Sequence, residues 1–503
     1  MAKRLRTTYV LLLAVSMAVG ARASAKDLGD LLVEKGLISQ KDLDELRKEA
    51  QQPEVSPSPV AASAPPAPSP PGAPPAPVGA VAAEPSGEDL TTRIKDEVQK
   101  NLPEWMKHFR ISTLMYMDWA YYVNTGYGPQ LLTQITPPGP GNDGFNSFDI
   151  TRAYINLFWK PTDRFTIRIT PNIFREIDTS AVVNTSKSSQ VATNINGNLS
   201  YRLKYGYLQI NNIFQDLEPL RDVPGLKDMN VKMGQIENPL IPWEEDLYGY
   251  RFTSLVPLNF LAYSSTDLGV ALMGPVTVDG ARWADYWVGY YNGSSFHSAE
   301  FNEFRSPQGR VSVYPGAATP GLENLGVTYF MSYGYTNVAP DTPDSLIRRM
   351  AALVHYNNKY GGIAFEWDRT RNQNTFANFF TGAAPTQTIP DPDNPGHTIP
   401  NPLTQLYTQI LNPTAIGQGF NVFGHINLGD SPFSLFGMWQ RWYPNLDYNP
   451  NPLDFNRLIA GVAWQPQSWM RVAVNSQNIM YFHNGPSVPQ DTHAIFTNLE
   501  LNY

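Results

Sequence analysis

The stretch that decides the fold runs from His108 to Val123 and reads HFRISTLMYMDWAYYV. Large apolar side chains occupy almost every second position, and Arg110, Ser112 and Asp118 are among the residues that alternate with them. A period of two places the two sets on opposite faces of a β-strand. A strand needs about 9–11 residues to cross the hydrocarbon of a bilayer at a tilt. The stretch is long enough, and it predicts a membrane-spanning strand with one apolar and one mixed face.

The same alternation recurs along the chain, for example in Arg164–Ile173 and Asn324–Tyr335. These runs exceed the five or six residues or so that are usual in soluble β-proteins. Counting them predicts about sixteen strands, and hence an all-β, antiparallel transmembrane barrel. The expected strands are 108–123, 147–160, 164–174, 200–214, 229–236, 261–275, 283–292, 309–315, 324–336, 347–358, 360–370, 416–429, 433–443, 455–466, 469–482 and 492–503.

The connections between these strands alternate in length, as they do in outer-membrane barrels. Several connections from an even to an odd strand are tight: 161–163, 358–359, 429–432 and 467–468. Most connections from an odd to an even strand are long and polar: 124–146, 175–199, 237–260, 371–415 and 443–454. An even number of strands then places both ends of the barrel on the short-turn side.

Composition agrees with a barrel. The 503 residues include 26 Tyr, 24 Phe and 11 Trp, yet the mean hydropathy is −0.31. In a barrel, apolar lipid-facing residues alternate with polar lumen-facing ones, so their hydropathies average out along the sequence. A helical membrane protein instead shows continuous apolar runs. The absence of cysteine excludes disulfides and thiolate metal sites, and the net charge of −8 argues against a nucleic-acid partner.

The N-terminal part divides by composition into four segments ahead of the barrel. Residues 1–25 have a basic start, a short apolar core and small residues at a cleavage site, which is typical of a secretory signal; an uncleaved anchor is the alternative. Residues 26–52 predict a short helical leader in the periplasm, 53–87 a disordered linker rich in Pro and Ala, and 88–107 a helical lead-in. The barrel is expected over 108–503.

The C-terminal residues alternate up to the last one. Leu499, Leu501 and Tyr503 fall on one face of the final strand. Soluble domains usually end in frayed polar residues. An aromatic residue that ends an apolar strand face resembles the signal read by the machinery that assembles outer-membrane barrels, which is therefore an expected partner.

Three segments resemble the phosphate-selective porin family. They are the stretch FDITRAYINLFWK at 148–160 with the hairpin that follows, KMGQIENP at 232–239, and LLVEKGLIS at 31–39. The resemblance covers nearly the whole mature chain. It implies a sixteen-stranded channel for ions and small solutes in the outer membrane of a Gram-negative cell, and a homotrimer in contact with the lipid.

Phosphate selectivity does not follow from the resemblance. Members with that preference carry clusters of Arg and Lys in the pore, and no matching lysine cluster is found here. Of the 37 basic and 45 acidic residues, 12 and 14 precede Trp105, which leaves 25 against 31 in the barrel. We therefore expect a general porin or one with a weak preference for anions.

Alternation places a set of basic residues on the inner face of the barrel. They are Arg152, Arg164, Arg168, Arg202, Lys204, Lys232, Arg349, Arg457 and Arg471. They outnumber the acids of the strands, among them Asp118, Glu366, Asp368 and Glu500. Such cations can set the sign of the potential inside a pore, or they can merely line a water-filled wall.

The connection 237–260 is expected to narrow the pore, because it is richer in apolar residues than the loop at 175–199. The constriction residues expected there are Trp243, Glu244, Glu245, Asp246, Tyr248 and Arg251. The alternatives are a loop that packs on a neighbouring subunit and a loop that folds over the rim. The Asp-rich turn at 391–396 lacks the glutamate of a calcium loop, and we interpret it as an exposed turn without a metal.

Catalytic motifs are missing. The sequence has no G-x-S-x-G, no H-E-x-x-H and no glycine-rich phosphate loop, so we expect neither an enzyme nor a cofactor. Two other functions stay open. An aromatic track could select organic solutes, or the barrel could be a structural or adhesive anchor that ties the envelope together through its leader.

Overall fold

The computed structural model describes residues 103–124, 143–178, 194–296 apart from 262, 300–335 apart from 301, 346–371, 388–390, 398–400, 406, 410, 414–482 apart from 449, and 491–503. The chain divides into two units, Met1–Lys107 and His108–Tyr503. The predicted signal, leader and linker, and most of the lead-in, lie outside the described residues.

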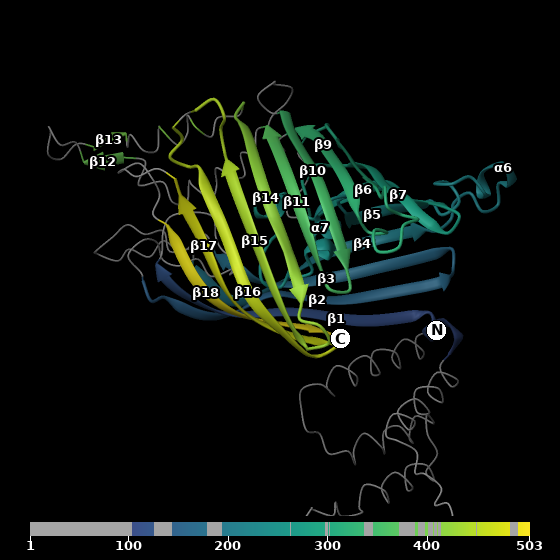
Figure 1. Ribbon diagram of the computed structural model, residues 1–503, viewed down its shortest axis with the longest axis horizontal. Coiled ribbons are helices and arrows are strands. Elements are labelled where there is room, and N and C mark those ends of the chain that lie inside the picture. The colour runs from purple at the N-terminus through teal and green to yellow at the C-terminus, as the bar shows by residue number, and fades with distance from the viewer. Residues whose placement is uncertain are drawn as a thin grey trace, which may run out of the picture. The chain divides into compact units, whose positions relative to one another are not determined.

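In the second unit, sixteen antiparallel strands form one closed barrel. Figure 1 shows how the strands are arranged around it. The sequence-based prediction of the fold is confirmed. The strands are β1 (Phe109–Asn124), β2 (Asn146–Thr162), β3 (Phe165–Asp178), β4 (Asn194–Ile210), β5 (Asn230–Glu237), β6 (Thr266–Val278), β7 (Ala281–Tyr291), β8 (Ser306–Val313), β9 (Gly326–Tyr335), β10 (Leu346–Asn358), β11 (Gly361–Arg371), β14 (Ile416–Asn427), β15 (Phe433–Tyr443), β16 (Phe455–Gln467), β17 (Met470–Tyr481) and β18 (Thr492–Asn502).

The remaining elements lie in the connections or ahead of the barrel. They are α5 (Glu104–Lys107), α6 (Glu218–Arg221), α7 (Ile241–Tyr248), α8 (Pro257–Phe260) and the short strands β12 (Thr388–Pro390) and β13 (Thr398–Pro400). The two short strands pair with each other in a separate sheet. They lie within the long connection 371–415, in a part for which the sequence predicts only a loop.

The first and last strands close the barrel. Leu114 pairs with Asn502, and the ladder continues to Tyr122 opposite Ala494. Tyr503 adds two backbone hydrogen bonds, because the amide of Thr113 donates to its carbonyl oxygen (2.7 Å) and its own amide donates to the carbonyl oxygen of Thr113 (2.9 Å). Closure leaves no unpaired strand edge, as a barrel in lipid requires.

Alternate residues of each strand lie on the inner and the outer face of the barrel. On β1, Tyr116, Asp118, Ala120 and Tyr122 are buried, whereas the alternate Val123 is 51% exposed. On β9, Val327, Tyr329 and Met331 are likewise exposed to the outside. Large apolar side chains repeat on the outer face of strand after strand. A continuous apolar band of this kind is what a barrel presents to membrane lipid.

Among the described residues, no helix is long and apolar enough to cross a membrane.

The four connections predicted to be tight are short in the structure, at 163–164, 359–360, 428–432 and 468–469. At the same end of the barrel, the connections from β4 to β5 (211–229) and from β8 to β9 (314–325) are longer, and the first of them holds α6. Tyr286 on β7 donates a hydrogen bond to the carbonyl oxygen of Gly225, so this connection packs on the barrel wall.

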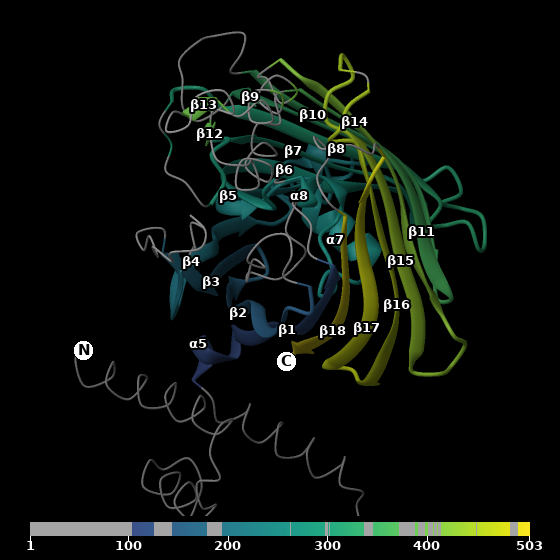
Figure 2. The same cartoon turned by 90° about the vertical axis from the view of Figure 1, so that its left-hand side faces the viewer.

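The largest cluster of buried apolar side chains lies inside the barrel, between the connection 238–265 and the inner faces of the strands. Figure 2 shows α7 and α8 of this connection within the ring of strands. We call residues 238–265, apart from 262, the inner loop. The expected strand over 261–275 begins only at Thr266, because Leu261 and its neighbours belong to this loop.

Candidate functional site

The inner loop is positioned from its first residue. The side-chain oxygen Oδ1 of Asn238 accepts hydrogen bonds from the amides of Leu240 (2.9 Å) and Ile241 (2.7 Å). These amides open α7 and have no carbonyl partner within the helix. At the other end, Gly249 has a φ of 74°, in the left-handed region that glycine adopts without strain. The sequence Asn-Pro…Gly thus encodes a short helix with both ends defined.

One side of α7 packs on the barrel wall. Ile241, Glu244 and Tyr248 are fully buried there. The ring of Trp243 meets His355 edge-on, with centroids 5.1 Å apart, and lies 4.7 Å from the guanidinium of Arg310. Five of the six residues expected at the constriction lie on this helix, and the structure turns three of them, Trp243, Glu244 and Tyr248, toward the wall.

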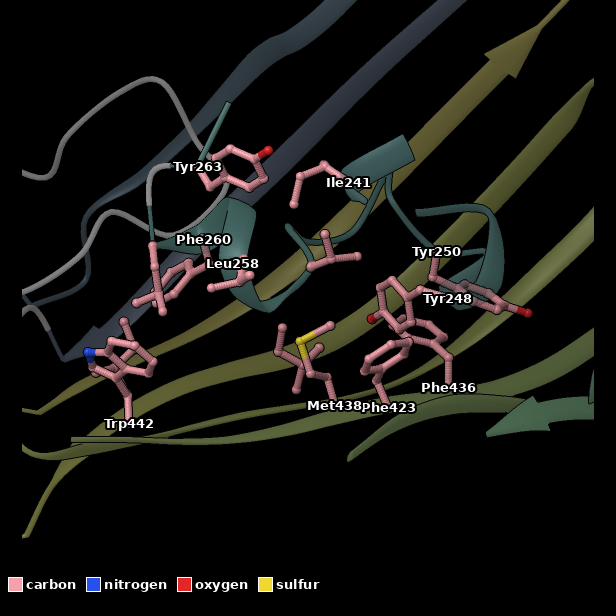
Figure 3. Packing of buried hydrophobic residues seen from close by; sticks show 14 of the residues in the cluster. Ile241, Tyr248, Tyr250, Leu258, Phe260, Tyr263, Phe423, Phe436, Met438 and Trp442 are labelled. Atoms are coloured by element: carbon pink, nitrogen blue, oxygen red, sulfur yellow. The ribbon is translucent and has the colours of Figure 1, made fainter. Parts of the chain in front are cut away.

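Aromatic side chains attach the loop beyond α7. Tyr250 stacks on Phe436 of β15, with ring centroids 4.5 Å apart and planes 9° apart, and its hydroxyl bonds that of Ser434. Tyr248 meets Phe423 of β14 edge-on at 5.8 Å. Figure 3 shows these side chains together on one stretch of the inner wall. Such aromatic pairs add to the free energy of burial.

Side chains of the wall also bind the backbone of the loop. Arg471 Nη1 donates to the carbonyl oxygen of Gly249 (2.7 Å), and Gln477 Nε2 donates to that of Thr253 (2.7 Å). Arg457 Nη1 donates to the carbonyl oxygen of Leu255 at 3.0 Å. Arg310 Nε donates to that of Pro239 at 2.8 Å. A buried loop needs partners for its carbonyl groups, and polar residues of β8, β16 and β17 supply them. The inner loop is therefore held along its length.

A cluster of carboxyl groups lies where α7 meets β11 and β14. Glu244 is fully buried beside Glu366 and Asp368, and Asn421 Nδ2 donates to both of the latter, at 3.2 and 2.6 Å. Burial and then the charge of Asp368 raise the pKa of Glu244 well above its usual value. Within the described residues, no group of three or more acidic or histidine side chains has the geometry of a metal site.

The inner faces of β2 to β4 carry cations held by aromatic rings. Arg152 lies over the rings of Tyr116 (5.6 Å) and Tyr154 (5.2 Å). Arg202 and Lys204 lie over Phe296, at 4.7 and 4.3 Å from its centroid. A cation over a ring face is attracted by the ring's negative electrostatic potential and is held in one place. These rings position the positive charges of this wall.

Further basic residues lie on the neighbouring wall. The guanidinium of Arg168 is 3.9 Å from the ring centroid of Tyr205. Arg168 and Lys232 both pair with Glu237, the last residue of β5, each at 3.0 Å. Two cations thus neutralise Glu237, the residue that directly precedes the inner loop.

The exposed side of α7 faces this basic wall. Arg251 forms an ion pair with Glu245, and both interact electrostatically with Arg152. Burial alone would raise the pKa of Glu245, but Arg251, Arg152 and Lys204 hold it below its usual value. Desolvation within the barrel, together with the charges of Glu245 and Glu237, raises the pKa of Asp246 to about 6.

The structure distributes the predicted site residues over three places. Arg152, Arg168, Arg202, Lys204, Lys232, Arg251, Glu245 and Asp246 surround one region between the inner loop and the walls formed by β2 to β5. Arg349, Arg457 and Arg471 lie on the inner face but contact the inner loop, over Tyr263, Phe260 and Tyr250. Arg164 lies in the turn after β2, where it pairs with Asp216.

Sequence reasoning missed the aromatic partners of the cations and the carboxyl cluster. Tyr116 lies at an even-numbered position of its strand, like Asp118, and Tyr154 is two residues from Arg152, so each tyrosine is expected on the same inner face as its charged neighbour. The alternation along the strands could therefore have predicted these two aromatic partners. It could not have predicted Phe296, which lies in the connection from β7 to β8, outside any strand.

Comparisons with known proteins leave the family undecided. No protein-family model and no curated protein matches the chain. Solved structures that are similar include OmpF of Salmonella typhi in complex with daunomycin, with 10% identity and a TM-score of 0.45 over 78% of this chain and 97% of that one. The outer membrane channel DcaP of Acinetobacter baumannii is 8% identical, with a TM-score of 0.45 over 78% of this chain and 97% of that one.

An anion-selective porin from Comamonas acidovorans is 8% identical, with a TM-score of 0.46 over 78% of this chain and 99% of that one. All three scores lie below 0.5, so the assignment of a sixteen-stranded barrel rests on the strand pairing of this chain itself. Membership of the phosphate-selective porin family stays a prediction.

Proposed function

We propose that the chain is a porin of a Gram-negative outer membrane, through which small hydrophilic solutes and ions diffuse passively, with a preference for anions. The observation that carries the proposal is the arrangement inside the barrel. The inner loop is bound to the wall from β8 to β17, and a basic wall from β2 to β5 faces its exposed side.

The number of strands supports a pore. Barrels of about eight strands are filled by their own side chains, whereas barrels of about 16–18 strands leave room for an aqueous channel. Here sixteen strands enclose one inner loop, and that loop packs against a part of the wall. The remaining inner face carries charged and hydroxyl groups, which favour water over a dry core.

The charges around this region favour anions. Six basic side chains (Arg152, Arg168, Arg202, Lys204, Lys232 and Arg251) face three carboxyl groups (Glu237, Glu245 and Asp246). Two of these acids are already paired with cations. A net positive region within low-dielectric walls raises the local concentration of anions and lowers that of cations.

Further parts of the proposal concern assembly. We propose a homotrimer in outer-membrane lipid, inserted by the barrel-assembly machinery that reads Leu499, Leu501 and Tyr503. Ile495, on the same face of β18, is 41% exposed and Tyr503 is 84% exposed to the outside, as an accessible signal requires. The helical leader would lie in the periplasm.

A planar bilayer tests the function directly. Purified full-length protein should give stable open steps, and across a KCl gradient the reversal potential should lie on the chloride side. Adding phosphate should reduce the chloride current if phosphate shares the pathway. Folded protein that gives no steps would overturn the porin proposal, and a reversal potential on the potassium side would overturn the anion preference alone. An unchanged chloride current would argue only against phosphate as a solute.

A further inference from the structure

Four cations of the basic wall each lie over two aromatic rings. A ring face close to a cation attracts it and holds it in one place. A second ring adds apolar surface beside the charge, so this part of the lumen is positive and apolar at once. The pairs are Arg152 with Tyr116 and Tyr154, Arg168 with Phe158 and Tyr205, Lys204 with Tyr205 and Phe296, and Lys232 with Tyr207 and Trp287.

Two β-bulges interrupt the alternation of the strands in this region. On β4, the register with β3 shifts between Leu203 and Tyr205, which leaves Lys204 as an extra residue. Regular alternation would send one of two consecutive residues outward. Lys204 and Tyr205 are instead both buried inside the barrel, at 2% and 8% exposed. On β2, the register with β1 shifts beside Arg152. Bulges re-aim side chains and are frequent next to functional sites.

Three cations converge on the inner faces of β2 to β4. Tyr154 of β2 lies opposite Asn172 of β3, and Asn172 lies opposite Arg202 of β4. Across this row, Lys204 interacts electrostatically with Arg152 and Arg202, and the two arginines interact with each other. Within the part of the chain that the structure describes, neither Arg152 nor Lys204 forms an ion pair with a carboxylate.

Other cations of the same wall do have such carboxylate partners. Arg168 and Lys232 share Glu237, each at a distance of 3.0 Å. Arg251, on the inner loop, pairs with Glu245. The positive charge that acts on a solute is therefore concentrated at the two cations that lack an acidic partner.

A solute in the lumen reaches one of these two cations and a ring, but it does not reach the other cation. Arg152 and Phe296 are only partly buried. Lys204 is covered, with its Nζ 4.3 Å from the ring centroid of Phe296 and hydrogen bonded to Oγ of Ser265. Lys204 thus adds its charge from behind the surface. A guanidinium that lies against rings keeps its N–H edge for a carboxylate, and a partly exposed ring can pack against a flat apolar group.

We propose that Arg152, Lys204 and Phe296 form a binding site for organic anions in which a carboxylate is attached to an aromatic ring. The proposal rests on the porin function inferred above and names the class of solute that the basic wall favours. The carboxylate accepts hydrogen bonds from Arg152, and the ring of the solute packs on Phe296 and Tyr154. A small inorganic anion meets the same charges but gains nothing from the rings. Aromatic walls with a few placed polar groups are common in ligand sites.

The test measures binding to the refolded full chain in detergent by saturation-transfer NMR, which detects weak ligands and does not depend on conduction. The probes are benzoate, cyclohexanecarboxylate and benzyl alcohol at neutral pH, with inorganic phosphate as a competitor. Benzoate and cyclohexanecarboxylate have the same charge and similar size, but only benzoate has a flat ring. The main variant is Phe296→Leu. Its matched control is Phe304→Leu, in the same connection, where the ring of Phe304 lies 4.5 Å from that of Tyr335.

The unmodified chain and the Phe304 variant should bind benzoate at least about threefold more tightly than cyclohexanecarboxylate, because a pair of aromatic rings adds about that factor. Phe296→Leu should bind the two acids equally, and Phe296→Tyr should keep the preference. Equal affinities in the unmodified chain, or a preference that survives in Phe296→Leu, would overturn the proposal. So would binding of benzyl alcohol as tight as that of benzoate, or displacement of benzoate by an equal concentration of phosphate.

A further variant, Arg152→Gln, separates the charge from the ring. It should weaken the binding of both acids at least about tenfold and preserve their ratio, because hydrogen bonds to a charged group are lost. Unchanged binding would contradict the assignment of the carboxylate to Arg152. Heat-dependent mobility on a gel shows whether each variant is folded.

Planar bilayers separate this inference from the porin proposal. Benzoate should reduce the KCl current at lower concentration than cyclohexanecarboxylate does. Folded protein that gives no open steps would overturn the porin function, while the NMR titration still decides whether the site exists. Open steps that both acids reduce equally would leave the porin function intact and overturn the preference for aromatic anions.

Discussion

Arg471 on β17 donates a hydrogen bond from Nη1 to the carbonyl oxygen of Gly249, 2.7 Å away, and pairs with Glu500 on β18 through Nε and Nη2. Gly249 is the residue at which α7 ends. One side chain thus connects two strands of the wall to the turn of the inner loop.

Replacing Arg471 with Gln should loosen this turn. The shorter side chain cannot reach both partners, so the free energy of unfolding should fall by about 1–3 kcal/mol. Open-channel current should become noisier because the inner loop gains freedom to move. Denaturation in urea and current recordings measure both effects. The control is Arg305→Gln, because the partners of Arg305 among the described residues are the backbone carbonyls of Asn302 and Phe304, close by in sequence. Equal current noise in the two variants would contradict the proposed role of Arg471 in holding the inner loop.

Glu244 should make stability depend on pH. Its pKa is raised by burial and by Asp368, so the folded state holds a proton that the unfolded state loses above a pH of about 4.3. Stability therefore falls as the pH rises from there toward the folded pKa. Glu244→Gln removes this ionisation and should flatten the decline, although Glu366 and Asp368 still contribute to it. Urea midpoints measured across the pH range check this, with the exposed Glu323→Gln as the control. A decline as steep in Glu244→Gln as in the unmodified chain would rule out this role.

Gly234 should not tolerate a side chain. Its φ is 123°, and a Cβ atom would lie 2.3 Å from the carbonyl oxygen of Gly206 on the neighbouring strand. Gly234→Ala should therefore cost about 1–3 kcal/mol in backbone strain or disturb the pairing of β4 with β5. At Gly309 the same change meets its first neighbour at 3.8 Å and should be accepted. Unfolding midpoints of the two alanine variants should differ clearly. Equal midpoints would show that a side chain at Gly234 does not strain the backbone.

A substitution of Tyr503 should impair assembly of the barrel in cells without lowering its stability. Its backbone bonds Thr113 in both directions, whereas its side chain is exposed. Tyr503→Ser keeps the backbone bonds, so protein refolded in detergent should unfold at the same urea concentration. In cells the amount of folded barrel in the outer membrane should drop several-fold, because the aromatic end of the signal is gone. Equal amounts in the membrane would argue that the side chain is no part of the signal.

Local pattern was enough to predict the barrel because lipid and lumen impose opposite polarity on alternate residues. The strand expected over 108–123 lies at Phe109–Asn124, and that over 433–443 lies at Phe433–Tyr443. The prediction failed at 200–214, where β4 ends at Ile210 and the connection with α6 follows. Phe214 continues an apolar pattern there, but the chain has already left the sheet.

The interior was less predictable because contacts across the lumen join residues far apart in sequence. Alternation indicated which arginines point inward, but it could not tell Arg152, which faces the exposed side of α7, from Arg457, which binds the inner loop. Nor could it reveal that Glu244 would meet Glu366. Those distinctions depend on where the inner loop settles, and that is decided by packing across the barrel.

The role of the basic wall is best measured as the reversal potential across a KCl gradient, for the unmodified chain and for the Arg152→Gln, Lys204→Gln double variant. We expect a potential on the chloride side for the unmodified chain and a clear shift toward potassium for the double variant. Arg164→Gln should keep the original value, since Arg164 pairs with Asp216 at the rim. A double variant as selective as the unmodified chain would show that the basic wall does not control the pore.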